Sequence, residues 1–188
     1  MELYFQPKWQ TADRTFYFRC VLELLQAVLD DEMFKQLRTV EQLGYYVACQ
    51  RRSTGGVAGI SFTVQSAVHD PIYCQGKIIE FLDEFYFDRF NEEMFNKYKA
   101  GVIARKTRGY GGLRDEAEDV FLRMVNFCQE ALPEPDWDRR EMEVGIINQI
   151  TFKEIKTYYK AFFAPQPPVW RSARIDQKDY DLYKSYTK

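Results

Sequence analysis

Hydrophobic residues recur with a helical spacing near the start of the chain, within residues 11–31. Four of them lie four positions apart: Phe16, Cys20, Leu24 and Val28. That spacing predicts an amphipathic helix with one face toward a core, and we expect Thr11 or Asp13 to cap its first turn. The preceding segment, ELYFQ, alternates hydrophobic and polar residues, which predicts a strand that ends at Pro7.

The pattern changes to that of strands in the next part of the chain. Residues 44–52 and 59–68 are rich in β-branched and aromatic residues, and the segment STGGVA between them carries two glycines. This arrangement predicts a β-hairpin. We also expect a short helix over residues 32–39, before the hairpin, and a final strand within residues 165–176, after a proline-rich corner.

Long helical periods dominate the rest of the sequence. The predicted helices cover residues 72–90, 91–108, 114–132, 139–150 and 151–163. Asn91 and Thr151 stand where N-caps are expected. The predicted order along the chain, with strands near the start, helices after them and one more strand near the end, is typical of the α+β class. We therefore predict a two-layer sandwich of a mainly antiparallel sheet packed with helices. We expect one domain over residues 1–175 and a polar tail over residues 176–188.

The charge and cysteine content narrow the classes of partner and compartment. The 26 basic and 28 acidic residues leave a net charge of -2, which gives no overall attraction to nucleic acid or to an anionic membrane. The bases within residues 91–108 could form a local nucleic-acid patch, although bases near the end of a helix more often complement its dipole. Four widely spaced cysteines, no signal-peptide pattern and no long apolar run favour a soluble, cytoplasmic chain with reduced thiols.

The histidine content argues against catalysis by this chain alone. His69 is the one histidine of the sequence. Hydrolytic zinc sites usually take two or three histidine ligands, and serine or cysteine triads need a histidine base. We therefore expect neither a metal site nor a catalytic residue in this chain.

The segment LRTVEQLGYYV, Leu37 to Val47, is the most specific motif. It resembles the L-R-T-x-E-Q-L-G-Y segment in the C-terminal half of the pitrilysin and insulin-degrading-enzyme (insulinase) family of zinc metallopeptidases. ELYFQ, GISFTVQS, WDRREMEVGIINQIT and TFKEIKTYYKAFF resemble other segments of the same domain. The resemblance covers residues 1–175 and is strongest between Phe34 and Ser66, and it departs from the family at Trp137, where Phe is usual.

The resemblance implies a domain of a larger enzyme. Family members have two halves of two related domains each, which close around a peptide, and the Zn²⁺ motif H-x-x-E-H lies in the first domain. This chain has no such motif. It is therefore similar to the fourth, non-catalytic, substrate-binding C-terminal domain, inactive alone, with Zn²⁺ in the parent enzyme. The implied partners are peptide substrates and the preceding domains or a catalytic subunit, and an exposed inter-domain surface would favour self-association.

Two residues of the motif carry the implied function. The resemblance implies that Arg38 and Tyr45 hold the substrate backbone near the scissile bond, and that Tyr45 supports the developing oxyanion. A guanidinium offers a planar donor fork for a carbonyl, and a phenol offers one directed hydrogen bond. Gly44 lets the backbone turn or approach closely just before Tyr45. Glu41 or Gln42 could orient the Arg38 side chain.

Other interpretations remain open from the sequence. Arg38 could be an ordinary base at a helix end, and Tyr45 and Tyr46 ordinary strand aromatics. The chain could also be a stand-alone domain that binds peptides or a catalytic subunit without enzymatic activity. A nucleic-acid-binding α+β domain rests only on the bases of residues 91–108.

Overall fold

The fold consists of a small sheet packed on one side by helices. The computed structural model describes residues 1–6, 15–54, 57–130 and 138–163. The strands are β1 (Glu2–Phe5), β2 (Tyr46–Thr54) and β3 (Val57–Gln65), and the helices are α1 (Thr15–Met33), η2 (Phe34–Val40), α2 (Pro71–Glu84), η3 (Phe85–Arg89), α3 (Glu92–Thr107), α4 (Leu113–Glu130), α5 (Arg139–Gln149) and α6 (Phe152–Phe163). The predicted α+β class is confirmed.

The sheet is antiparallel throughout, with strand order β1-β3-β2. The predicted hairpin is confirmed, since β2 and β3 pair from Tyr46 opposite Gln65 to Thr54 opposite Val57. One face of the sheet is buried by hydrophobic residues from all three strands: Leu3, Phe5, Val47, Cys49, Ile60, Phe62 and Val64. Successive side chains of a strand point to opposite faces of the sheet, so every second residue of each strand packs against the helices.

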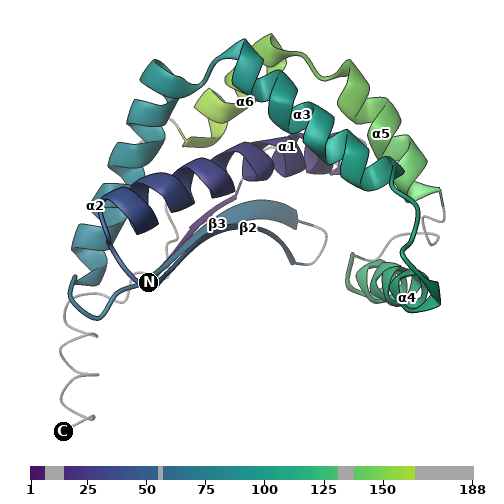
Figure 1. The fold of residues 1–188 in the computed structure, drawn as a ribbon, viewed down its shortest axis with the longest axis horizontal. Coiled ribbons are helices and arrows are strands. Elements are labelled where there is room, and N and C mark those ends of the chain that lie inside the picture. The colour runs from purple at the N-terminus through teal and green to yellow at the C-terminus, as the bar shows by residue number, and fades with distance from the viewer. Residues whose placement is uncertain (7–14, 55–56, 131–137, 164–188) are drawn as a thin grey trace, which may run out of the picture.

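Helix α1 lies between the sheet and the outer helices. In Figure 1 it runs along the sheet, while α2, α3, α5 and α6 arch over it and α4 stands apart. Cys20, Leu24 and Val28 of the predicted stripe are buried, and so are residues on the other sides of the helix, such as Leu22 and Glu23. The helical side of the sandwich is therefore two helices deep, and α1 is buried on all sides from Phe18 to Leu25.

Helix α1 also protects the outer edge of the sheet. Strand β2 is an edge strand, because it pairs only with β3 within the described residues. At Cys49 its outward backbone groups are nevertheless satisfied: the amide donates to Asp30 Oδ1 at 2.8 Å, and the carbonyl accepts from Gln26 Nε2 at 3.2 Å. Polar side chains of α1 thus take the place of a fourth strand at this point.

An ion network ties α1 to α3 and α5. Lys106 of α3 lies 2.8 Å from Glu23 of α1 and also binds Glu143 of α5, which accepts from Arg139 Nε at 2.9 Å. Lys99 donates to the carbonyl oxygens at the end of α5 and just after it. Several bases of residues 91–108 are thus engaged within the domain, rather than forming a solvated helix face.

The helix boundaries follow the capping pattern where the structure describes it. Asn91 accepts from the amide of Met94, and Thr151 forms a reciprocal pair of hydrogen bonds with Glu154, so both predicted caps are confirmed. Asp70, which was not predicted as a cap, begins α2 by accepting from two amides. The expected caps of α1, the final strand and the tail lie outside the described residues. None of the described helices is long and apolar enough to cross a membrane.

Candidate functional site

The candidate site begins where helix α1 passes into the wider helix η2. Seven residues, Phe34–Val40, adopt π-helical geometry, and the amide of Glu41 donates to the carbonyl of Gln36 at 2.9 Å. Leu37 is buried and anchors this turn. The predicted short helix is present, but as a π-helix that continues α1 without a break. Such wide turns are frequent at functional sites.

The chain then reverses direction over four residues. Gln42 adopts a left-handed backbone conformation with φ 51°, and the amide of Leu43 donates to the carbonyl of Leu37 at 2.8 Å. Leu43 is buried, which holds the turn against the core. The reversal brings the residues after it back alongside the end of η2.

Gly44 allows two backbone segments to approach closely. A Cβ atom at this position would lie 2.8 Å from the carbonyl carbon of Gln65, and closer still to its oxygen. The adjacent amide of Tyr45 donates to that same carbonyl oxygen at 3.1 Å. The predicted need for glycine before Tyr45 is thus explained by backbone proximity.

Arg38 and Tyr45 lie against each other. Arg38 Nε donates to the backbone carbonyl of Tyr45 at 3.0 Å, and its guanidinium carbon lies 5.8 Å from the centroid of the Tyr45 ring. Within the described residues, the terminal nitrogens of Arg38 and the hydroxyl of Tyr45 make no hydrogen bond. Tyr45 is 86% exposed. The Nε edge of the guanidinium is therefore fixed by the backbone of Tyr45.

These side chains share a groove of about 390 Å³. Its lining residues are Arg38, Gln42, Leu43, Gly44, Tyr45, Gln65, Ser66, Ala67 and Val68. The wall formed by residues 65–68 was not predicted from the sequence. It could have been inferred from the hairpin, because antiparallel pairing returns the end of β3 to the start of β2.

The loop after β3 is held in shape by local contacts. Ser66 Oγ accepts from the amides of Val68 and His69, at 3.3 and 3.0 Å. The imidazole of His69 stacks on the ring of Tyr73, with 4.6 Å between their centroids. His69 thus lies beside the groove in a packing contact. The backbone of this wall is fixed by its own hydrogen bonds.

Glu41 and Gln42, the two residues expected to orient Arg38, are placed differently relative to the groove. Glu41 accepts from Gln36 Nε2 at 3.0 Å and lies 3.4 Å from Lys77 Nζ, so it faces away from the groove. Gln42 lines the groove and is exposed. No hydrogen bond joins either residue to Arg38 in the part of the chain that is described, and Arg38 is instead held by the carbonyl of Tyr45.

The groove can bind a carbonyl-rich ligand, but it carries no water-activating group. The described residues contain no group of three or more His, Cys, Asp or Glu that could hold a metal ion. Cys20, Cys49 and Cys74 are buried free thiols. Burial raises the pKa of Cys20 to about 12, and the nearby carboxylates of Glu143 and Glu23 act in the same direction. The donor set does not fit a resident zinc ion.

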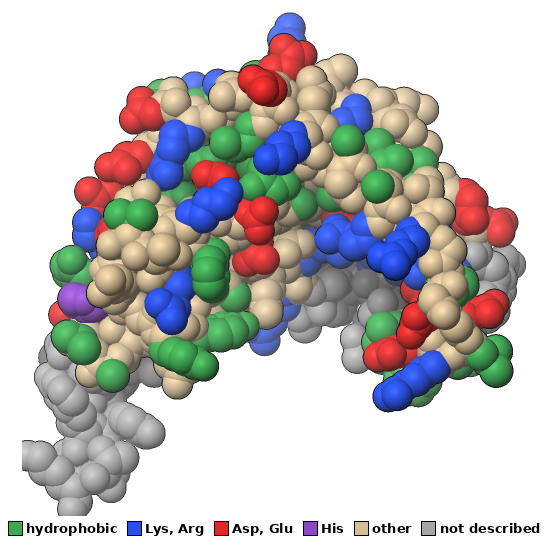
Figure 2. Space-filling view, in the orientation of Figure 1, with side chains coloured by type: hydrophobic (Ala, Val, Ile, Leu, Met, Phe, Trp, Pro, Cys, Tyr) green, Lys and Arg blue, Asp and Glu red, His purple; other side chains and the backbone are tan. Residues whose placement is uncertain are grey.

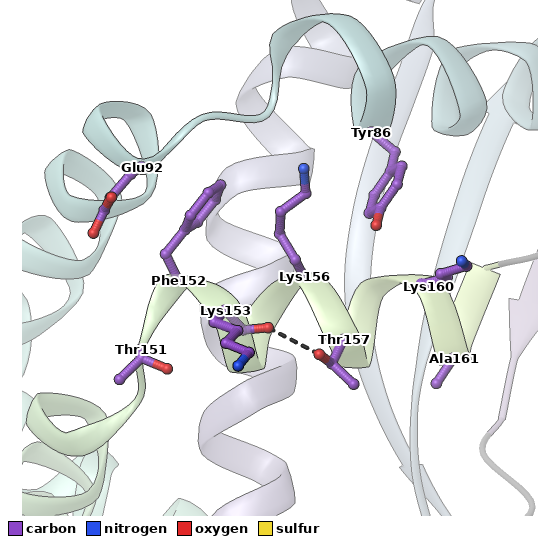
Figure 3. Close-up of a pocket in the computed structure, with 9 residues that line it drawn as sticks. All are labelled: Tyr86, Glu92, Thr151, Phe152, Lys153, Lys156, Thr157, Lys160 and Ala161. Atoms are coloured by element: carbon purple, nitrogen blue, oxygen red, sulfur yellow. Dashed lines mark hydrogen bonds between the residues drawn. The ribbon is translucent and has the colours of Figure 1, made fainter.

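A second, wider groove of about 830 Å³ lies between η3, α3 and α6. Figure 3 shows Lys156 between the rings of Phe152 and Tyr86, and its ammonium lies 4.7 Å from the Tyr86 centroid and 5.6 Å from that of Phe152. Thr157 donates to the carbonyl of Lys153 in the same helix. None of the residues that the sequence singled out as candidate site residues lines this groove.

Comparisons with known proteins identify relatives of the chain. A family model described as "PQQ synthase PqqF-like, C-terminal lobe domain 4" matches residues 24–121. The chain is 30% identical over 177 residues to a nardilysin-like protein of Arabidopsis thaliana, a match that covers 93% of this chain and 17% of that protein. It is 30% identical over 158 residues to the insulin-degrading enzyme of Drosophila melanogaster, covering 82% of this chain and 15% of that enzyme.

A solved structure agrees with these sequence matches. The crystal structure of pitrilysin is similar with a TM-score of 0.71 and 21% identity, over 88% of this chain and 17% of that chain. The chain therefore spans about a sixth of the length of these relatives. The region matched by the family model includes η2, the hairpin and the whole groove around Arg38 and Tyr45.

Proposed function

Because this chain belongs to the PqqF-like C-terminal lobe domain 4 family, and thus to the C-terminal domains of insulinase-family proteins, we propose that it is the non-catalytic, substrate-holding domain of a longer zinc metalloendopeptidase. The observation that carries the proposal is the contact between Arg38 and Tyr45, which both line one groove. The substrates of the proposed peptidase are peptides, consistent with relatives such as insulin-degrading enzyme.

The geometry supports different roles for the side chains of Arg38 and Tyr45. The Tyr45 carbonyl fixes Arg38 through Nε, which leaves the two terminal nitrogens as a planar fork for the backbone carbonyl of a peptide. The Tyr45 hydroxyl has no partner within the described residues and can donate to the carbonyl that is being attacked. One directed hydrogen bond of this kind stabilises the charge that develops on the oxygen of the attacked carbonyl.

The remaining chemistry belongs to another part of the proposed polypeptide. Zn²⁺, when bound there, would lower the pKa of its water and polarise the scissile carbonyl. In the part of the chain that the structure describes, no group of three or more His, Cys, Asp or Glu could hold the metal, so the role we propose for this chain is to position the peptide opposite it. The isolated chain should therefore not hydrolyse peptides, with or without added zinc.

The proposal is tested by replacing Arg38 with Lys in the full-length polypeptide. Lysine keeps the charge but loses the planar fork, so we expect KM for a peptide substrate to rise while zinc content and thermal stability stay unchanged. Arg52→Lys is a control, because Arg52 is likewise held within the domain, by the carboxylate of Glu2 at 3.0 Å, but lies on β2 outside the groove. Equal KM values for Arg38→Lys and the wild type would argue against substrate holding by Arg38.

The full-length reading frame provides an independent test. A zinc motif of the form H-x-x-E-H upstream of this chain is expected. Its absence, combined with peptide binding by the isolated chain, would favour the stand-alone binding domain instead.

A further inference from the structure

Helix α4 exposes hydrophobic side chains at the surface over residues 113–124. Figure 1 shows this helix set apart from the arch of α3 and α5, and Figure 2 shows hydrophobic side chains exposed on it, at the lower right. Its apolar stripe consists of Leu113, Ala117, Val120, Phe121 and Met124, which follow the spacing of one helical face. All five are exposed, Leu113 at 83% and Phe121 at 65%.

Polar contacts fix which side of α4 faces the domain. Asp119 accepts from Arg123 one turn later and from the Tyr110 hydroxyl at 2.7 Å, and it lies 3.2 Å from Arg140 of α5. The Arg140 guanidinium also lies over the Tyr110 ring, 4.3 Å from its centroid. These contacts hold the side of the helix that carries Asp119 and Arg123 toward α5, while the stripe lies on sides that stay exposed.

This orientation is the reverse of that expected in a self-sufficient domain. An amphipathic helix at the surface normally buries its apolar stripe and exposes its charges. Here the exposed apolar surface is on the order of several hundred Å², a size that marks interaction sites. We infer that the stripe is the docking face for another domain of the same polypeptide. This inference rests on the proposed function, in which the chain is one domain of a longer protein.

The dimensions of the stripe favour an intramolecular partner over a second copy. From Leu113 to Met124 the stripe is roughly 17 Å long. Two such stripes would bury well under the roughly 1,200 Å² that stable complexes between separate chains need. Contacts between domains of one chain are effective at smaller areas, because the linker keeps the partners at high effective concentration. The relatives supply such partners, since this chain covers only 15% to 17% of their length.

Docking at α4 would act on the substrate groove from a distance. Strand β2 connects the two regions: it contacts α4, while its first residue, Tyr46, lies next to the groove residue Tyr45. A nine-residue strand spans about 30 Å. A domain held at α4 would therefore fix the sheet, and with it Arg38 and Tyr45, without covering the groove.

The experiment places a photoreactive side chain in the full-length polypeptide. Phe121→p-benzoylphenylalanine tests the stripe, and Leu122→p-benzoylphenylalanine is the matched control, since Leu122 is 51% exposed on another side of the same helix. We expect irradiation at position 121 to give an adduct to a segment outside residues 1–188 of the same molecule, with no doubling of mass. Position 122 should give little or none.

Three results would overturn the inference: a dimeric adduct from position 121, an adduct confined to residues 1–188, or equal intramolecular yields from both positions. A second measurement compares Phe121→Glu with Leu122→Glu in the same polypeptide. Only Phe121→Glu should lower the melting temperature and increase cleavage within α4 by an added protease. If these tests gave negative results, the expected rise in KM for Arg38→Lys would be unaffected. The docking role of α4 and the proposed function are therefore tested independently.

Discussion

Gly44 offers a stringent test of how the candidate groove is built. Alanine at this position would place Cβ 2.8 Å from the carbonyl carbon of Gln65 and 3.2 Å from Cα of Ser66. Both are backbone atoms, so no side chain can rotate away, and the two segments must separate. Such overpacking costs about 1–3 kcal/mol. Separation would also weaken the 3.1 Å hydrogen bond from the Tyr45 amide to Gln65, a further loss of about 1 kcal/mol.

The expected cost of Gly44→Ala is therefore about 2–4 kcal/mol in the free energy of unfolding. Gly101→Ala is the matched control, because Gly101 lies within α3, where an added Cβ would meet no heavy atom of another described segment within 4 Å. In an open helical position alanine should stabilise by about 1 kcal/mol. Urea denaturation of the 188-residue chain measures both. Equal free energies for Gly44→Ala and the wild type would refute the close approach of the two segments.

Three further predictions concern buried and strained groups. Burial raises the pKa of Glu143, but hydrogen bonds from Lys106 and Arg139 outweigh burial and hold the pKa below 4.5. The stability that Glu143 contributes is therefore complete above pH 4.5 and is lost as the pH falls through the pKa of the folded state. Glu143→Gln should cost about 3 kcal/mol in the free energy of unfolding at pH 7, and it should flatten the decrease in melting temperature at acid pH. Cys20, with a pKa of about 12, should react with a thiol reagent only as fast as the domain unfolds, and rapid labelling of the native state would contradict its burial. Gln42→Gly should raise the free energy of unfolding by about 1 kcal/mol in urea titrations, because glycine adopts the left-handed backbone conformation of this residue without strain. An unchanged free energy of unfolding would show that the turn is unstrained.

The sequence predicted those features that depend on local spacing. The hairpin, the caps Asn91 and Thr151 and the helical periods all follow from residues a few positions apart, and the structure confirms them. The motif from Leu37 to Val47 also directed attention to Arg38 and Tyr45, which the structure brings into contact. Their functional roles remain a prediction.

Features that depend on distant segments could not be inferred from the sequence. Lys106 pairs with Glu23 and Glu143, which lie on two other helices, so a basic run that suggested a solvated face is partly buried. The π-helical turn before Gln42 differs from an α-helix only in its hydrogen-bond pattern, which side-chain spacing does not reveal. Likewise, a helical period gives the apolar stripe of α4 but not the direction in which it faces.

We propose that the Tyr45 hydroxyl acts on the scissile carbonyl in a full-length zinc peptidase that contains this domain. The most direct measurement is kcat/KM for Tyr45→Phe beside Tyr46→Phe, with zinc content and melting temperature determined for both. Tyr46 is a neighbouring exposed tyrosine whose hydroxyl already accepts from Gln50 Nε2. We predict that Tyr45→Phe loses about 2.7–4 kcal/mol of transition-state stabilisation, mainly in kcat, while Tyr46→Phe stays close to the wild type. Wild-type kcat/KM in a folded, zinc-loaded Tyr45→Phe enzyme would contradict the account.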